Sequence, residues 1–179
     1  MATFAIDPAH TDVLFSAKHM MVTSVRGKFT DVSGTIEIVD SDPTASTADI
    51  TVQTTSIDTG FGARDTHLRS DDFFSVERYP EIHVTSTAIR PKGGNDFVVT
   101  ADVTIRDVTK PVDFDVEFLG FYPAMDGARR AGFRATAKVN RKDWNLNWNV
   151  ALEAGGLLVG DAIKLEVEVA LQQAIALAA

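Results

Sequence analysis

The segment from Arg64 to Phe74 holds the densest group of side chains that could do polar chemistry. Arg64, His67 and Arg69 supply donors that could meet a phosphate or another polar head group, because charge-assisted hydrogen bonds to anionic oxygens are strong. The segment also permits a structural interpretation, in which the two arginines pair with neighbouring carboxylates and lock a capping loop. Those carboxylates are Asp65, Asp71 and Asp72.

The remaining motifs do not support catalysis or metal binding. Asp58-Thr59-Gly60 matches the aspartic protease tripeptide, but that chemistry needs two such carboxylates and the chain has no second copy. The stretch Gly60–Asp65 begins like a dinucleotide fingerprint, but Asp65 would place a negative charge beside the pyrophosphate. There is no cysteine, and no close metal spacing joins the four histidines, which are His10, His19, His67 and His83. We therefore predict a protein that is not an enzyme, with no catalytic residue, no metal site and no required cofactor.

Composition and charge exclude further classes of function. Acidic residues outnumber basic ones 25 to 17, which gives a net charge of −8. Because nucleic acids are bound through Lys and Arg, we expect no nucleic-acid partner. No stretch approaches the roughly 20 apolar residues that span a bilayer, so we expect no permanent membrane insertion. The N-terminal residues lack the basic segment and apolar run of a secretory signal, and we expect a cytoplasmic protein.

The elements that must position these side chains are mostly strands. Apolar and polar residues alternate with period two along much of the chain, which predicts half-buried β-strands; the clearest runs are 112–118, 133–140 and 163–172. Short turns between consecutive strands favour an antiparallel meander, closed as a barrel or stacked as a sandwich. Helix-forming residues between Phe61 and Ser70 predict one short helix. We find no linker or repeat and predict a single domain over residues 1–179.

The alternation also predicts which residues point inward. Many inward positions are small, such as Ala17, Ala101 and Ala135, and an eight-stranded barrel can hold one small ligand. Two alternatives follow: an open lumen, or a core in which facing Phe rings fill the space that the alanines leave. The predicted ligand-binding residues are Val13, Phe15, Ala17, His19, Phe29, Ile36, Ile50, Val52, Ile82, Val84, Val103, Phe114, Phe133 and Ala135.

The chain resembles the YceI-like family of polyisoprenoid-binding, lipocalin-like proteins over nearly its whole length. The densest match is Ser56-Ile-Asp-Thr-Gly60 followed by Arg64-Asp-Thr-His-Leu-Arg-Ser70 and Asp72-Phe-Phe74. Further matches are Ile6–His10, Phe15–Met20, Val25–Phe29, Gly34–Ile36, Tyr79-Pro80, Ser86-Thr87, Thr104–Val112, Asn140-Arg141 and Val159–Asp161. The resemblance implies an eight-stranded antiparallel barrel with a short helical insertion and a long apolar lumen for an isoprenoid chain. Members of the family are often periplasmic and can pair as homodimers; the absence of a signal here argues against a periplasmic role.

These observations together predict a binding protein for an isoprenoid lipid, such as a quinone tail or a prenyl phosphate. It would carry or sequester the lipid, in a role connected with stress. The first alternative is an enzyme that acts on a small apolar or quinone-like substrate in the same lumen, with His19 as acid or base. The second is a stress-response module whose filled barrel acts only through partners.

Overall fold

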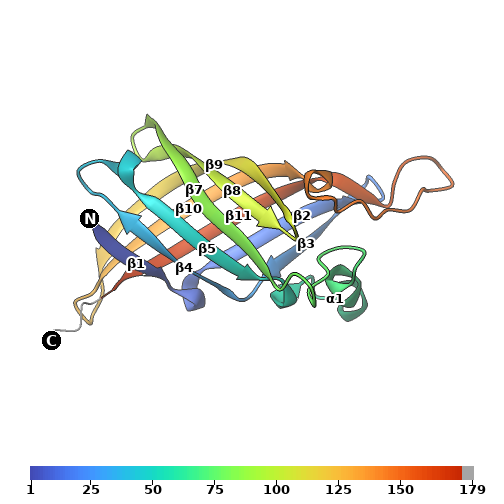
Figure 1. Cartoon of the computed structure of the whole chain (residues 1–179), viewed down its shortest axis with the longest axis horizontal. Coiled ribbons are helices and arrows are strands. Elements are labelled where there is room, and N and C mark those ends of the chain that lie inside the picture. Colours follow the sequence, from blue (N-terminus) through green and yellow to red (C-terminus); the bar gives the residue numbers. More distant parts are fainter. Residues whose placement is uncertain (175–179) are drawn as a thin grey trace.

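The computed structural model describes residues 1–174, and their strands form one eleven-stranded antiparallel sheet that closes on itself through a pairing between β1 and β11 (Figure 1). The closing pair aligns Phe4 with Gln173 and Ile6 with Leu171. Closure confirms the predicted barrel and excludes the sandwich. The strands are β1 (Ala2–Ile6), β2 (Asp12–His19), β3 (Thr23–Phe29), β4 (Val32–Ile38), β5 (Thr47–Gln53), β6 (Ile57–Asp58), β7 (Glu81–Gly93), β8 (Asp96–Ile105), β9 (Val108–Pro123), β10 (Arg129–Asn140) and β11 (Val159–Gln173).

The eleven strands make eight barrel segments, because three segments are interrupted. β1 and β2 pair with successive parts of β11, while β3 and β4 pair with β2 and β1 respectively. In the same way, β6 pairs with β3, and β5 pairs with β4. The predicted eight-stranded antiparallel barrel is therefore confirmed, with β1–β2, β3–β4 and β5–β6 as its broken segments.

The first interruption shows why the chain breaks there. Pro8 has no backbone N–H to give to the sheet and begins the 3₁₀ helix η1 (Pro8–His10). The Asp7 carboxylate caps this turn: it accepts a hydrogen bond from the Ala9 backbone N–H at 3.1 Å and contacts the His10 ring at 2.9 Å. The hydrogen bond with His10 lowers the pKa of the Asp7 carboxyl. The chain thus turns while β1 and β2 stay against the same neighbour.

One part of the inward alternation is wrong in detail. Simple alternation through β7 predicts that Ala88 faces the interior after Ser86. A β-bulge shifts the register between these two residues, so that Ala88 is exposed and Ile89 points into the barrel. A bulge adds one residue to a strand and moves the following side chains to the opposite face.

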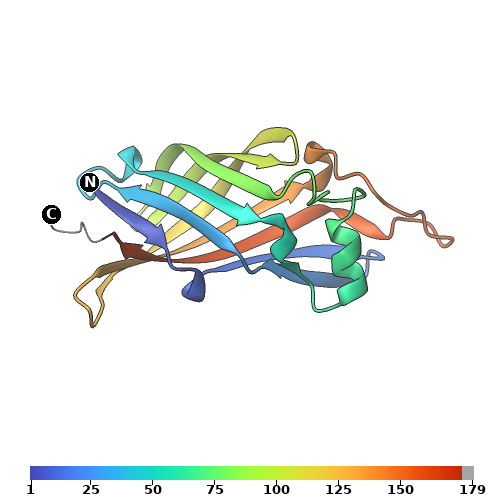
Figure 2. The same ribbon diagram turned by 60° about the horizontal axis from the view of Figure 1, so that its bottom comes forward.

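The two ends of the barrel are covered differently (Figure 2). The predicted short helix is confirmed as α1 (Gly62–Arg69), which lies at one end together with η4 (Arg141–Trp144) and the long segment 145–158. The opposite end carries η2 (Pro43–Ala45) and the β9–β10 turn. The remaining 3₁₀ helix, η3 (Thr54–Ser56), connects β5 to β6. Among residues 1–174, no helix is long and apolar enough to cross a membrane.

Candidate functional site

The barrel encloses two adjoining cavities, with volumes of about 470 Å³ and about 520 Å³. The smaller, called here the far-end cavity, reaches Asp40, Pro43 and Arg129. The larger, called the helix-end cavity, reaches Arg64 and Trp148. Both volumes lie within the range of small-molecule sites, whereas packed protein interiors hold few voids larger than a water molecule. The lumen is therefore open, and of the two alternatives the filled core is wrong.

Every residue predicted to bind the ligand lines one or both cavities. The far-end cavity alone contains Ile36, Ile50, Phe133 and Ala135. The helix-end cavity alone contains Phe15, Ala17, His19, Phe29, Ile82 and Val103. Both contain Val13, Val52, Val84 and Phe114. The inward orientation follows from the period of two, while ligand contact at these positions stays a prediction.

Five side chains line both cavities and therefore lie where the two cavities meet; together they are called here the waist. Val13, Val52, Val84, Phe114 and Val167 line both of them, and these residues come from strands distributed around the barrel. All five side chains are apolar and lack hydrogen-bonding groups. A ligand that occupies both cavities must pass this waist and would meet only hydrocarbon there.

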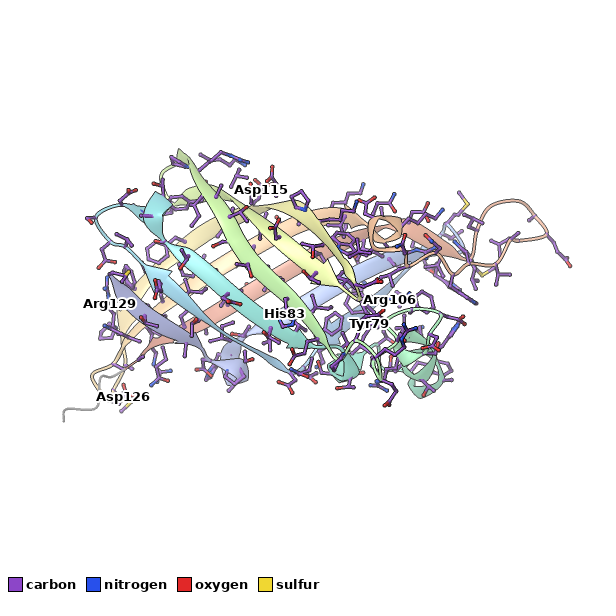
Figure 3. The ribbon with its side chains drawn as sticks, in the orientation of Figure 1. Tyr79, His83, Arg106, Asp115, Asp126 and Arg129 are labelled. Atoms are coloured by element: carbon purple, nitrogen blue, oxygen red, sulfur yellow. The ribbon has the colours of Figure 1, made fainter. Side chains whose placement is uncertain are left out.

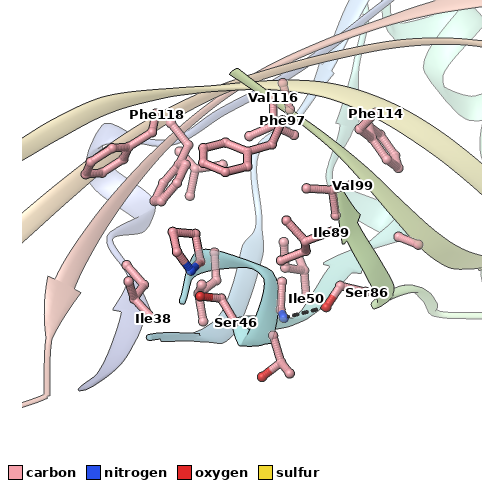
Figure 4. Close-up of a pocket in the computed structure, with 18 of the residues that line it drawn as sticks. Ile38, Ser46, Ile50, Ser86, Ile89, Phe97, Val99, Phe114, Val116 and Phe118 are labelled. Carbon is pink, nitrogen blue, oxygen red and sulfur yellow. Dashed lines mark hydrogen bonds between the residues drawn. The ribbon is translucent and has the colours of Figure 1, made fainter. Parts of the chain in front are cut away.

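The aromatic side chains pack against one another along the wall and leave the centre open. Phe118 and Phe133 have ring centroids 5.1 Å apart, and Phe15 and Phe29 have centroids 5.6 Å apart. Figure 4 shows Phe97, Phe114 and Phe118 on one side of the far-end cavity, with Ile50 and Ser86 across from them. The hydroxyl oxygen of Ser86 accepts a hydrogen bond from the Ala48 backbone N–H at 2.8 Å, so this polar atom is satisfied within the wall.

An ion pair borders the far-end cavity. The Arg129 guanidinium donates to Asp40 with its Nη1 at 2.9 Å and its Nη2 at 3.3 Å, and it stacks over the Phe121 ring at 3.6 Å from the centroid. Figure 3 places Arg129 at the end opposite α1. The hydrogen bond from Arg129 lowers the pKa of the Asp40 carboxyl. The charges of Arg129 and Asp40 compensate each other, so the residues that line this cavity carry no net charge that would attract a charged head group.

The helix-end cavity is bordered by basic side chains. Lys18, Arg64 and His67 all line it, and no acidic residue does within the part of the chain that the structure describes. Arg64 is oriented by Thr59, which accepts from Nε through its hydroxyl oxygen at 2.7 Å and from Nη2 through its carbonyl at 2.9 Å. Since neither acceptor is a carboxylate, these bonds do not neutralise the positive charge. Two of the three predicted head-group residues, Arg64 and His67, are thus brought together at this cavity.

The third head-group candidate, Arg69, lies elsewhere. Its guanidinium donates from Nε to the carbonyl of Thr55 at 3.0 Å and from Nη2 to the carbonyl of Ile57 at 2.7 Å, and it lines neither cavity. Arg69 therefore holds α1 against the chain entering it, and its assignment to the head-group set is corrected.

The other interpretation of this segment, in which the two arginines pair with neighbouring carboxylates, is also wrong. Neither Arg64 nor Arg69 forms an ion pair with a carboxylate among residues 1–174. Asp65 instead accepts from the backbone N–H and hydroxyl of Thr59, and Asp71 accepts from the Ser75 hydroxyl. Asp72 contacts His67 at 2.8 Å.

Sequence reasoning missed a buried cation beside the helix-end cavity. Arg141 is 4% exposed and donates to the backbone carbonyls of Leu146, Trp148, Val159 and Gly160, and to Asp161. Burial lowers the pKa of its guanidinium. Because these bonds employ both terminal nitrogens and Nε, Arg141 organises the segment after η4 and has no donor left for a ligand. A single Arg beside Asn140 carries no sequence signal of burial.

The other three histidines lie apart from one another. His19 lines the helix-end cavity, whereas His10 contacts Asp7 and His83 contacts Glu81, both outside the lumen. Within residues 1–174, no three His, Cys, Asp or Glu side chains come together in a way that could hold a metal ion.

Comparison with known proteins identifies a matching family and several proteins that this chain resembles in sequence or structure. The family model described as "YceI-like domain" matches residues 4–171. Protein YceI of Escherichia coli is 38% identical over 137 residues, which cover 76% of this chain and 71% of that protein. BcnA of Burkholderia cenocepacia has a similar structure, with a TM-score of 0.77, 23% identity and coverage of 92% of this chain and 98% of that one. A polyisoprenoid binding domain from Saccharophagus degradans gives a TM-score of 0.71 at 16% identity, with coverage of 97% and 99%.

Proposed function

Because this chain belongs to the YceI-like family, we propose that it binds a long-chain isoprenoid lipid in its lumen and carries or sequesters it. The similar domain from Saccharophagus degradans is described as polyisoprenoid-binding. The observation that carries the proposal for this chain is the pair of apolar cavities joined at a waist. Their combined form suits a ligand that is long, narrow and hydrocarbon over most of its length.

Burial of hydrocarbon supplies the binding free energy. Each CH₂ moved from water into the lumen contributes roughly 0.8 kcal/mol. The ordering of a flexible chain opposes this gain, and net affinity reaches a ceiling. Affinity should therefore rise with chain length until both cavities are filled, and then level off. Lumen depth sets the length preference, since the waist holds no polar group that could recognise individual units.

The basic border of the helix-end cavity sets the direction of the ligand. The polar head lies beside Lys18, Arg64 and His67, and the tail passes the waist into the far-end cavity. Arg64 is the principal contact, because Thr59 fixes its orientation without removing its charge. An anionic head suits these residues better than a neutral one, which favours a prenyl phosphate over a quinone.

Tryptophan fluorescence tests the proposal directly. The chain has two tryptophans, Trp144 and Trp148, and both line the helix-end cavity. Titration with isoprenoid alcohols of increasing length should change this fluorescence with one site per chain and with affinity that rises and then levels off. No saturable change for any length would contradict the proposal. Straight-chain alcohols of matched length are the control for selectivity among hydrocarbons.

A further inference from the structure

Exposed apolar side chains gather at the helix end of the barrel. The β2–β3 turn consists of Met20, Met21 and Val22, whose exposed fractions are 48%, 68% and 78%. Val150 and Leu157, in the segment between η4 and β11, are also exposed. Both loops project from the end that carries α1 (Figures 1 and 2). The two loops, residues 20–22 and 149–158, are called here the apolar tip.

The two loops are joined to each other. The Met20 backbone N–H donates to the Leu158 carbonyl at 2.8 Å, and His19 pairs with Val159 in the sheet. The Met21 thioether lies against Gly156, in the space that a Cβ there would occupy. The apolar tip is therefore one surface, although its parts are far apart in sequence.

The backbone of the turn is unfavourable for the residues that occupy it. Met20 and Met21 have φ values of 51° and 63°, in the left-handed region where Asn and Gly are favoured. A long apolar side chain at such a position carries a conformational cost, and in this chain neither methionine is buried to compensate it. The exposed pair therefore points to a partner that buries it.

The apolar tip suits an apolar medium. The Val22 N–H donates to the His19 carbonyl, and the Leu158 N–H donates to the Val150 carbonyl, so these backbone groups are satisfied without water. Glu153 is the only charged residue within 20–22 and 146–158. The large apolar side chains of the tip can therefore leave water while these hydrogen bonds stay in place.

The charges beside the apolar tip favour a lipid bilayer over a second copy of this chain as the partner. Lys18 and Arg64 lie at the adjoining cavity, where cations would meet the phosphates of lipid head groups while the tip enters the acyl region. A second copy of the chain apposed through the same tip would bring like charges together.

Phe61, which is 60% exposed, lines the helix-end cavity, so apolar surface continues from the outside into the lumen.

From these observations we infer that the apolar tip docks into the surface of a lipid bilayer and places the helix-end cavity against it. Docking is end-on and shallow. It gives a lipid tail a path from the membrane into the lumen without crossing water. This use of the docked state rests on the proposed function, whereas docking itself does not.

Sedimentation with phosphatidylcholine vesicles that contain no isoprenoid tests the inference. The parent should co-sediment. A double variant, Met20→Asn with Met21→Gly, should lower the partition coefficient by about tenfold or more, because it removes most of the apolar area of the turn. It should melt at or above the parent temperature, since the new residues favour positive φ. Val22→Ser offers a second variant outside the strained positions and should lower partition by a smaller factor.

Met125→Asn is the matched control, because Met125 is a fully exposed methionine in the β9–β10 turn. This turn lies at the opposite end of the barrel (Figure 1). It should partition like the parent. Absence of vesicle binding by the parent, or equal binding by the double variant, would overturn the inference. Loss of dimers in the double variant, seen by ultracentrifugation, would overturn it in favour of self-association. Fluorescence titration with isoprenoid alcohols in the absence of vesicles should be unchanged in the double variant, and failure of that titration in the parent would count against the proposed function alone.

Discussion

The His67 imidazole packs edge-on against the Trp148 indole, with ring centroids 4.5 Å apart and planes at 89°. This contact connects helix α1 to the segment that follows η4 across the border of the helix-end cavity. Phe73 joins the pair, with centroids 5.2 Å from His67 and 5.5 Å from Trp148. All three rings line the helix-end cavity, so the cluster forms part of its border.

Removal of one ring of this cluster should accelerate ligand exchange. Trp148→Ala is expected to raise the dissociation rate of a bound isoprenoid by about tenfold, because aromatic pairs contribute about 0.5–1.5 kcal/mol beyond area burial and the missing indole widens the opening. Trp148→Phe keeps an aromatic ring and should stay within about twofold of the parent. Stopped-flow displacement monitored through Trp144 measures both rates. Unchanged dissociation in Trp148→Ala would show that the ligand does not leave past this cluster.

Arg64 and Arg69 should separate head-group recognition from loop stability. Arg64→Gln is expected to weaken a prenyl phosphate by about one to two orders of magnitude, the value of a lost charge-assisted hydrogen bond, and to leave the matching prenyl alcohol unaffected. Arg69→Gln loses its bonds to Thr55 and Ile57 and should lower the melting temperature while weakening both ligands equally. Calorimetric titration measures the affinity of each variant for both ligands. If Arg64→Gln loses the same affinity for the phosphate and the alcohol, Arg64 does not recognise the head group.

Occupation of both cavities can be tested at Ala135, which lines only the far-end cavity. Ala135→Trp should abolish binding of a long isoprenoid, because the indole fills space that the tail needs. A short isoprenoid that fits the helix-end cavity should bind as before. Thr136→Trp, at the neighbouring exposed position, is the control and should bind both ligands like the parent. If Ala135→Trp binds long and short ligands equally well, the tail does not enter the far-end cavity.

The Arg129–Asp40 pair should be visible in an acid titration. Since the hydrogen bond from Arg129 lowers the pKa of the Asp40 carboxyl, the pair stabilises the fold at neutral pH, and its contribution is lost as pH falls through that lowered value. Arg129→Gln should move the pKa of Asp40 upward, toward its ordinary range. Arg134→Gln is the control, because Arg134 pairs with Glu117 and Glu168 on the outer face. Carboxyl-carbon NMR measures the shift, and an Asp40 pKa that Arg129→Gln leaves unaltered would contradict the assignment.

Much of the fold was predictable because a strand has a period of two. Alternation identified the inward residues of β2, β9 and β10, since a one-residue slip would have exposed them all. It failed at Ala88, because a bulge advances the register there and no residue type in the sequence indicates a bulge at this position. The short helix followed from the composition of 61–70, but the closure of β1 onto β11 depends on residues far apart in sequence.

The site was predictable in its lining but not in its volume. Alternation says which face Ala135 and Phe133 occupy, whereas the open space depends on how the rings of Phe118 and Phe133 pack. The roles of Arg64 and Arg69 could not be separated from sequence, because both belong to one short helix and differ only in the direction they face. Arg141 was missed because its acceptors are backbone carbonyls, which leave no pattern in the side chains.

Native mass spectrometry of the protein purified without detergent tests the central claim most directly. A lumen that holds an isoprenoid tail predicts one bound lipid per chain, with masses that differ by whole isoprene units, and loss of this lipid in Ala135→Trp but not in Thr136→Trp. A bound lipid without isoprene units, or a ligand mass that persists in Ala135→Trp, would contradict the account.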